Sequence, residues 1–218
     1  LPHPYMQASR EAPAVHELRK TPKDTHVFGG LWHTDFTNLP TPSLANALYA
    51  REVPEVGGDT LFTNMYLAYE MLSPGMKNLL EGLNAVHGFA ESYKKNIALE
   101  EAKSGVTKVD ADTIAYRANY DAEVLHPVIR VHPDSGRQML YVNPGFTLRF
   151  ENMTTEESQP LLDFLYQHSI RPEFTFRYRW RVDTLGIWDN RSSMHHALND
   201  YPGKTRVMDR MVVVEPAT

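Results

Sequence analysis

The sequence predicts a mainly-β fold, a double-sheet roll with helical insertions, in one domain that spans residues 1–218. Three observations support this prediction. Short apolar or alternating runs typical of strands recur along the chain, helical patterns are few, and the two kinds of segment do not alternate as they do in βαβ folds. We find no internal repeat that would indicate a solenoid or a propeller.

The strand predictions depend on alternation and on turn residues between apolar runs. Phe174, Phe176, Tyr178 and Trp180 alternate with arginines, which predicts a strand with an aromatic face and a basic face. A hairpin is expected where two apolar runs flank Asp134-Ser135-Gly136. The expected strands are one short strand within 1–30, then 44–50, 60–62, 126–131, 138–142, 174–181, 185–188 and 206–214.

The helix predictions depend on capping residues. We expect helices over 67–72 and 75–83, with Ser73 as the cap of the second and Pro74 at its first position. Thr154-Thr155-Glu156-Glu157 resembles a capping box and precedes apolar residues at helical spacing. A third helix is therefore expected after Thr154.

Residues 94–123 are charged and poorly patterned. We expect them to form either a solvent-exposed surface loop or a mobile lid that closes over a substrate. The chain starts at Leu1-Pro2-His3-Pro4, without Met, charge or an apolar stretch, so we expect no signal peptide and a trimmed start.

Composition and charge exclude several classes of protein. The formal net charge is −5, so the chain has no broad basic field for nucleic acid. No apolar run approaches the ~20 residues needed to cross a bilayer, so we expect no membrane association. Cys is absent, which excludes disulfides and Cys-ligated zinc and fits a cytoplasmic location.

Two segments far apart in the chain carry the chemistry. His33 and Asp35 are separated by one residue, and on a strand both side chains would project to the same side. Alone, this pair is as consistent with a hydrogen-bonded His–Asp pair as with two metal ligands. A third ligand would have to come from the Trp188-to-His195 segment, where His195 or His196 is available. Only one of these two can face the metal, because adjacent side chains of an extended segment point in opposite directions.

Arg210 follows His195 by fifteen residues, on a strand that alternates Arg206, Met208 and Arg210 on one side. The arginines could be solvated on a surface strand. Alternatively, Arg210 points into the roll and its planar guanidinium binds the distal carboxylate of a keto acid, with Thr60 as a hydroxyl donor. Two histidines and one carboxylate leave one face of a metal open, which suits non-haem Fe(II).

Together these segments resemble the taurine dioxygenase / 2,4-D dioxygenase family. The resemblance is carried by Trp32-His33-Thr34-Asp35, by Gly57-Gly58-Asp59-Thr60, and by Trp188-Asp189-Asn190-Arg191 through His195 to Arg210. It runs from about residue 3 to residue 214 and implies that some of the family's N-terminal strands are missing here, because chains of this family are usually longer at that end. It implies a double-stranded β-helix, or jelly roll, and an enzyme that uses Fe(II), 2-oxoglutarate and O2.

The resemblance also implies roles for individual residues. His33, Asp35 and His195, rather than His196, would hold the iron, and the retained carboxylate predicts hydroxylation rather than halogenation. The 2-oxoglutarate carboxylate would be bound by Thr60 and Arg210, with Arg206 and Trp188 at further co-substrate positions. His3, Ser92, Tyr93 and Phe146 match substrate-binding positions, although His3 could be a frayed terminal residue and Phe146 a core residue.

Gly29 departs from the pattern of taurine enzymes, which carry an asparagine near the substrate amine. The expected substrate is therefore a small organic anion: a sulfonate such as taurine or a relative, an alkyl sulfate, or an aryloxyalkanoate. The expected reaction is hydroxylation next to the heteroatom, with release of succinate and CO2. A homo-oligomer, dimer or tetramer, is expected from the family.

Two other functions fit parts of this pattern. A non-catalytic jelly-roll protein that binds a metal or ligand would have no need for a dicarboxylate clamp. A zinc hydrolase could use the same two histidines and the aspartate, but it would need a general base and would have no use for Arg210.

Overall fold

Two antiparallel sheets form the body of the protein. The structure, a computed structural model, describes residues 14–89 and 122–214. The larger sheet has the order β1 (Val15–Lys20), β12 (Arg206–Val213), β2 (Ala45–Glu52), β10 (Leu185–Asp189). The smaller sheet has the order β11 (Ser193–Ala197), β3 (Thr60–Asn64), β9 (Thr175–Tyr178). Neighbours in each sheet are distant in the chain, as a jelly roll requires, so the fold class predicted from sequence is confirmed.

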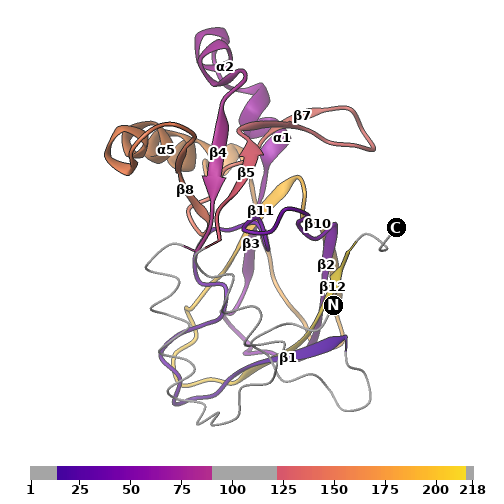
Figure 1. The fold of residues 1–218 in the computed structure, drawn as a ribbon. Coiled ribbons are helices and arrows are strands. Elements are labelled where there is room, and N and C mark those ends of the chain that lie inside the picture. The colour runs from indigo at the N-terminus through magenta and orange to yellow at the C-terminus, as the bar shows by residue number, and fades with distance from the viewer. Residues whose placement is uncertain (1–13, 90–121, 215–218) are drawn as a thin grey trace.

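The helices gather at one end of this roll (Figure 1). They pack with a third sheet, β5 (Val124–Pro127), β4 (Asn84–His87) and β8 (Thr147–Phe150), and with the β6–β7 hairpin (Ile129–Val131 and Gln138–Leu140). The helices are α1 (Met65–Glu70), α2 (Pro74–Leu80) and α5 (Thr155–Ser169), and a 3-10 turn, η1 (Pro172–Phe174), leads into β9. These are the expected helical insertions.

The predicted caps are confirmed. The Ser73 hydroxyl accepts a hydrogen bond from the Met76 backbone N–H at 3.2 Å, with Pro74 at the first helical position. Thr154 and Glu157 form the reciprocal capping box of α5. Helix α1 begins at Met65, two residues before the predicted start, because Asn64 supplies the cap through its side-chain oxygen.

Other boundary predictions were wrong. The hairpin strand begins at Ile129, because His126 belongs to β5 and pairs with Ala85 of β4. Strands β4, β8 and β11 were not predicted. The segment around His33 is not a regular strand: His33 makes one isolated bridge, and Asp35 lies in a turn.

A smaller apolar cluster lies within the roll and contains Leu48, Ala50, Trp180 and Met208, whereas the main apolar core lies at the helical end. The core includes Leu80, Leu140, Phe150, Leu162 and Leu165, each almost fully buried. In contrast, the buried residues of the roll include several that are polar or charged: His16, Lys20, Asn46, Thr60, Arg206 and Arg210. Burying such groups is unfavourable unless they find partners, so the roll is built to hold a polar ligand. Within the described ranges, the helices are too short or too polar to cross a membrane.

Candidate metal and co-substrate site

A bridge between two distant segments creates the site. The His33 backbone N–H donates to the His195 carbonyl at 3.0 Å, and the His195 N–H donates to the His33 carbonyl at 2.8 Å. The two imidazole rings consequently lie 4.2 Å apart, centroid to centroid. Strand β11 holds His195 through its pairing with β3, where His195 is opposite Phe62.

Asp35 completes a group of three ligand-type side chains. His33, Asp35 and His195 each offer one atom, and these atoms all lie within 4.8 Å of one another. Asp35 Oδ1 is 3.5 Å from His33 Nε2, and Asp35 Oδ2 is 3.3 Å from His195 Nε2. All three residues are buried. This is the trio that the sequence analysis selected.

The protonation of the two histidines suits metal binding. His33 Nδ1 lies 2.6 Å from the Leu31 carbonyl, which can only accept a hydrogen bond, so Nδ1 donates to it and Nε2 is the ring nitrogen that faces Asp35. Burial, reinforced by the nearby His33 ring, lowers the pKa of His195 to about 3. The His195 imidazole is therefore neutral near pH 7, as metal ligation requires.

Asp35 remains ionised despite its burial. Burial by itself raises the pKa of a carboxyl group, but the Arg210 guanidinium and the two imidazoles outweigh it and hold the pKa of Asp35 well below its usual value. Arg210 Nη2 is 2.9 Å from Asp35 Oδ1, and both side chains are almost fully buried. The same nitrogen lies 3.4 Å from the Asn46 side-chain oxygen.

The Asn190 side chain holds the Asp35 backbone from both sides. Its amide nitrogen donates to the Asp35 carbonyl at 2.9 Å, and its oxygen accepts from the Asp35 N–H at 3.1 Å. The same nitrogen also lies 2.9 Å from the Ser43 hydroxyl and 3.1 Å from the Ser43 carbonyl. Asn190 thus ties the turn that carries Asp35 to the end of β10.

Glycines allow the backbone to approach the His33 side chain. A Cβ atom at Gly145 would lie 2.8 Å from His33 Cβ, closer than such atoms approach. A Cβ at Gly29 would lie 3.2 Å from His33 Cε1, and Gly29 has a positive φ of 75° that favours glycine. The departure noted at Gly29 therefore coincides with direct packing of its backbone against the His33 imidazole.

His196 does not join the group of three ligand-type side chains. It neighbours His195 on β11, and its ring packs edge-on against Trp32 at 5.5 Å. Burial lowers the pKa of His196 as well, but its nitrogens are not part of the cluster. Strand alternation accounts for this difference between the neighbours.

The two arginines of β12 lie in different surroundings. Arg210 contacts Asp35, whereas Arg206 lies near the turn that leads into Thr60: a Cβ at Gly58 would be 3.2 Å from Arg206 Cδ. Within the described part of the chain, Nε and Nη2 of Arg206 are buried and have no hydrogen-bond partner. The Thr60 hydroxyl accepts a hydrogen bond from Trp180 Nε1 at 2.9 Å, which leaves its own hydrogen for another acceptor.

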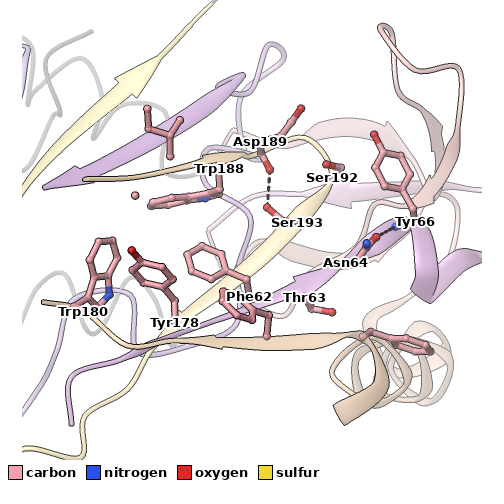
Figure 2. A pocket seen from close by; sticks show the side chains of 14 residues that line it. Phe62, Thr63, Asn64, Tyr66, Tyr178, Trp180, Trp188, Asp189, Ser192 and Ser193 are labelled. Carbon is pink, nitrogen blue, oxygen red and sulfur yellow. Dashed lines mark hydrogen bonds between the residues drawn. The ribbon is translucent and has the colours of Figure 1, made fainter. Parts of the chain in front are cut away.

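Trp188 and Phe62 cover one side of His195. Their ring centroids lie 5.0 and 6.2 Å from the His195 ring. Both also line a cavity of about 450 Å³ between β9 and β10, which Figure 2 shows with Tyr178 and Trp180 beside them and Asn64 and Tyr66 at the opposite end. These aromatic side chains exclude water from the back of the imidazole.

Most of the predicted substrate residues cannot be placed. His3, Ser92 and Tyr93 lie outside the described residues, as does the lid predicted at 94–123, apart from its last two residues. Phe146 is described and buried, and its ring is 5.6 Å from that of Phe89. It follows Gly145, the residue against the His33 side chain, so a position at the wall of the site stays a prediction.

Several residues that the structure places at or near the site were not identified from sequence: Lys20, Asn190, Gly145, Trp180 and Tyr201. Asn190 and Trp180 fell inside motifs, but no spacing rule connects Asn190 with Asp35. A buried lysine at the end of a short strand was the one available signal for Lys20.

The site thus combines two imidazoles and one ionised carboxylate with buried arginines, inside a jelly roll. This arrangement defines the class of non-haem metal proteins with two histidine ligands and one carboxylate ligand. Comparison with known proteins identifies the family. Residues 1–212 match the model of the "Taurine catabolism dioxygenase TauD, TfdA family". The chain belongs to this family.

Individual relatives agree with this result. The chain is 35% identical over 190 residues to an alkylsulfatase of Acinetobacter baylyi, covering 86% of the chain and 57% of that protein. It is 34% identical over 184 residues to an alpha-ketoglutarate-dependent sulfate ester dioxygenase of Pseudomonas putida, covering 84% of the chain and 58% of that protein. The crystal structure of a taurine dioxygenase from Burkholderia xenovorans superposes with a TM-score of 0.75 at 31% identity, covering 99% of this chain and 67% of that one. The chain spans less than two thirds of the length of these two curated relatives.

Proposed function

We propose that the chain carries the catalytic domain of an Fe(II)- and 2-oxoglutarate-dependent dioxygenase that hydroxylates a small organic anion. The observation that carries this proposal is the buried group of His33, Asp35 and His195, with its ligand atoms within 4.8 Å of one another. In such an enzyme the organic anion is oxidised next to its heteroatom, and 2-oxoglutarate is converted to succinate and CO2.

The three side chains fit a divalent ion. Asp35 Oδ2 is buried and has no hydrogen-bond partner among the described residues, although it faces His195 Nε2. A metal between these atoms would satisfy the unpaired carboxylate oxygen. Two imidazole nitrogens and one carboxylate oxygen are the ligand set expected for non-haem Fe(II), which when bound would supply O2 activation coupled to decarboxylation of the keto acid.

The protein's own contribution is orientation and exclusion of water. Leu31 fixes the His33 tautomer, Asn190 fixes the Asp35 backbone, and Arg210 fixes the carboxylate itself. Partners of this kind typically change metal affinity or activity ~10–100-fold when they are removed. The Phe62 and Trp188 rings keep the far side of His195 dry.

The surroundings of the two arginines support a division of roles that differs from the one implied by the sequence resemblance. Arg210 lies beside the metal ligands, so we propose that it contacts the anionic group of the organic substrate next to the metal. Arg206 lies near the turn before Thr60 and has unpaired buried N–H groups, so we propose that it binds the distal carboxylate of 2-oxoglutarate. A guanidinium and a hydroxyl are suitable donors for a carboxylate.

The substrate class is proposed from the relatives. Their names describe action on alkyl sulfates, sulfate esters and taurine, so a sulfonate or a sulfate ester is the first choice and an aryloxyalkanoate the second. Gly29 offers no side chain to a substrate amine, which supports a substrate other than taurine. A cytoplasmic location and assembly as a dimer or tetramer stay predictions.

The test is succinate formation with Fe(II), 2-oxoglutarate and ascorbate across a panel of alkyl sulfates, sulfonates and aryloxyacetates. Substrate-stimulated succinate is expected, and it should be abolished in His195→Ala but retained in His196→Ala. Arg206→Met should raise the KM for 2-oxoglutarate, and Arg210→Met the KM for the organic anion. Absence of stimulation across the panel, or activity that survives in His195→Ala, would contradict the proposal.

A further inference from the structure

The end of the roll opposite the metal ligands contains two buried cations. Lys20 of β1 and Arg206 of β12 are paired residues in the β1–β12 register, and each is 5% exposed. Among the residues that the structure describes, neither has a carboxylate oxygen within 4.0 Å of its charged nitrogens. Asp59 acts on Arg206 only at longer range, because its carboxylate contacts Arg177 at 2.7 Å. Two buried like charges without a carboxylate in contact are costly, so an anion bound here would stabilise the protein.

Tyr201 connects these two cations. The Lys20 ammonium lies 4.4 Å from the centre of the Tyr201 ring. On the other side, Tyr201 Cε1 and Arg206 Cδ border the same space, at 3.3 and 3.2 Å from where a Cβ of Gly58 would be. The absence of a side chain at Gly58 therefore lets both the tyrosine and the arginine pack against its backbone, which places them beside each other.

Both of these neighbouring side chains have donors without partners. The buried Tyr201 hydroxyl has no hydrogen-bond partner within the described ranges, and neither do Nε and Nη2 of Arg206. Buried donors of this kind are normally satisfied, so each unsatisfied group needs a ligand or a water molecule. Thr60 follows Gly58 by two residues, which brings the hydroxyl proposed for the distal carboxylate to the same end of the roll.

We propose that Lys20 and Tyr201 are further specificity-determining residues, which join Arg206 and Thr60 in binding the distal carboxylate of the keto acid. This inference rests on the proposed function. With two cations instead of one, the site favours a dianionic keto acid over a monoanionic one. Lys20 compensates the charge of the distal carboxylate, and the Tyr201 hydroxyl limits the length of the keto acid that fits between the metal and Arg206.

The test compares two ligands that differ only at the distal end. Binding of 2-oxoglutarate and of 2-oxopentanoate, which has a methyl group in place of the distal carboxylate, is measured by calorimetry on the Mn(II)-loaded protein. Lys20→Met should weaken binding of 2-oxoglutarate by about tenfold or more, as expected for loss of a charge-assisted contact. Binding of 2-oxopentanoate should change less than about twofold. Tyr201→Phe should weaken 2-oxoglutarate binding about threefold to tenfold.

Lys23→Met serves as the matched control, because Lys23 follows the same strand and is exposed. Thermal unfolding of the ligand-free variants separates folding from recognition: Lys20→Met removes an uncompensated charge and should not lower the melting temperature. If the wild-type protein binds no 2-oxoglutarate, the proposed function itself fails. If it binds, and Lys20→Met changes the affinity for both keto acids equally or not at all, only the present inference is overturned.

Discussion

Asn190 offers the sharpest test of how the site is held in place. Its side chain is completely buried and makes four contacts of 2.9–3.1 Å, two with the Asp35 backbone and two with Ser43. Asn190→Ala removes these contacts and leaves a buried N–H and two buried carbonyls without that partner. At about 1 kcal/mol for each contact, reduced by relaxation, the expected loss of unfolding free energy is about 2–4 kcal/mol.

The expected loss converts to measurable quantities. In a domain of this size 1 kcal/mol shifts the melting temperature by about 2–4 °C, so Asn190→Ala should melt about 4–16 °C below wild type. The Asp35 carboxylate loses its fixed position, so the affinity for Mn(II) or Fe(II) should fall by about 10–100-fold. Calorimetric unfolding and metal titration of the same preparation give both values.

Asn84→Ala is the matched control. Asn84 donates one 2.8 Å hydrogen bond to Glu151 from strand β4, which contributes no member of the proposed metal site. This variant should lose some stability and retain metal affinity. If Asn190→Ala also retains metal affinity within twofold while it loses stability, Asn190 supports the fold but does not position Asp35, and the argument for its role is refuted.

Three further predictions concern Gly145, His87 and Trp180. Gly145→Ala places a methyl group 2.8 Å from His33 Cβ and should weaken metal binding. The control Gly75→Ala, whose methyl group would meet nothing within 4 Å, should leave metal binding unchanged. Equal effects of the two substitutions would refute the role of close packing at His33. Burial and the neighbouring His126 lower the pKa of His87 to about 3 in the folded protein. In the unfolded protein the pKa of this histidine is about 6.5, so as the pH falls the unfolded state binds a proton before the folded state does. The free energy of unfolding should therefore decrease by about 2 kcal/mol between pH 7 and pH 5 because of His87. Denaturant titrations of His87→Phe should show a decrease that is smaller by this amount. Trp180→Phe removes the 2.9 Å hydrogen bond to the Thr60 hydroxyl and should weaken 2-oxoglutarate binding about threefold to tenfold in calorimetry, with metal affinity unchanged.

The sequence was sufficient to predict the parts of the fold that local rules control. The Ser73 cap, the Thr154–Glu157 capping box and the strands with clear alternation are confirmed, because each depends on residues close together in the chain. Strand β11 was not predicted, because Ser193–Ala197 has no alternation of its own and is extended by its pairing with β3. The predicted start of the hairpin strand at His126 was wrong for the same reason, because His126 pairs with Ala85 of β4.

The site shows a similar division. His33, Asp35 and His195 could be selected because the residue types and their order restrict the chemistry. The choice between His195 and His196 rested on the family resemblance, and the structure supplies an independent reason in the bridge between His33 and His195. The contacts of Asn190 with Asp35 could not be predicted, because no pattern in the chain links residues this far apart.

The interior face of β1 and β12 supports the different roles that we propose for the two arginines. Three inward pairs follow one another along these strands: His16 with Arg210, Leu18 with Met208, and Lys20 with Arg206. The middle pair is apolar, so the two charged ends are separated, and at ~3.3 Å per residue their backbones lie about 13 Å apart. A single carboxylate cannot compensate both ends.

Asp35 already compensates Arg210 at the end near the metal ligands. At the other end, Lys20 and Arg206 have no carboxylate partner in the described ranges. A ligand that compensates this far end would place a negative charge there, and a ligand that also reaches the proposed metal site would pass Leu18 and Met208. A keto acid that chelates the metal and ends in a second carboxylate has this pattern. The charge arrangement of two strands thus supports the same co-substrate as the three ligand-type side chains, from different residues.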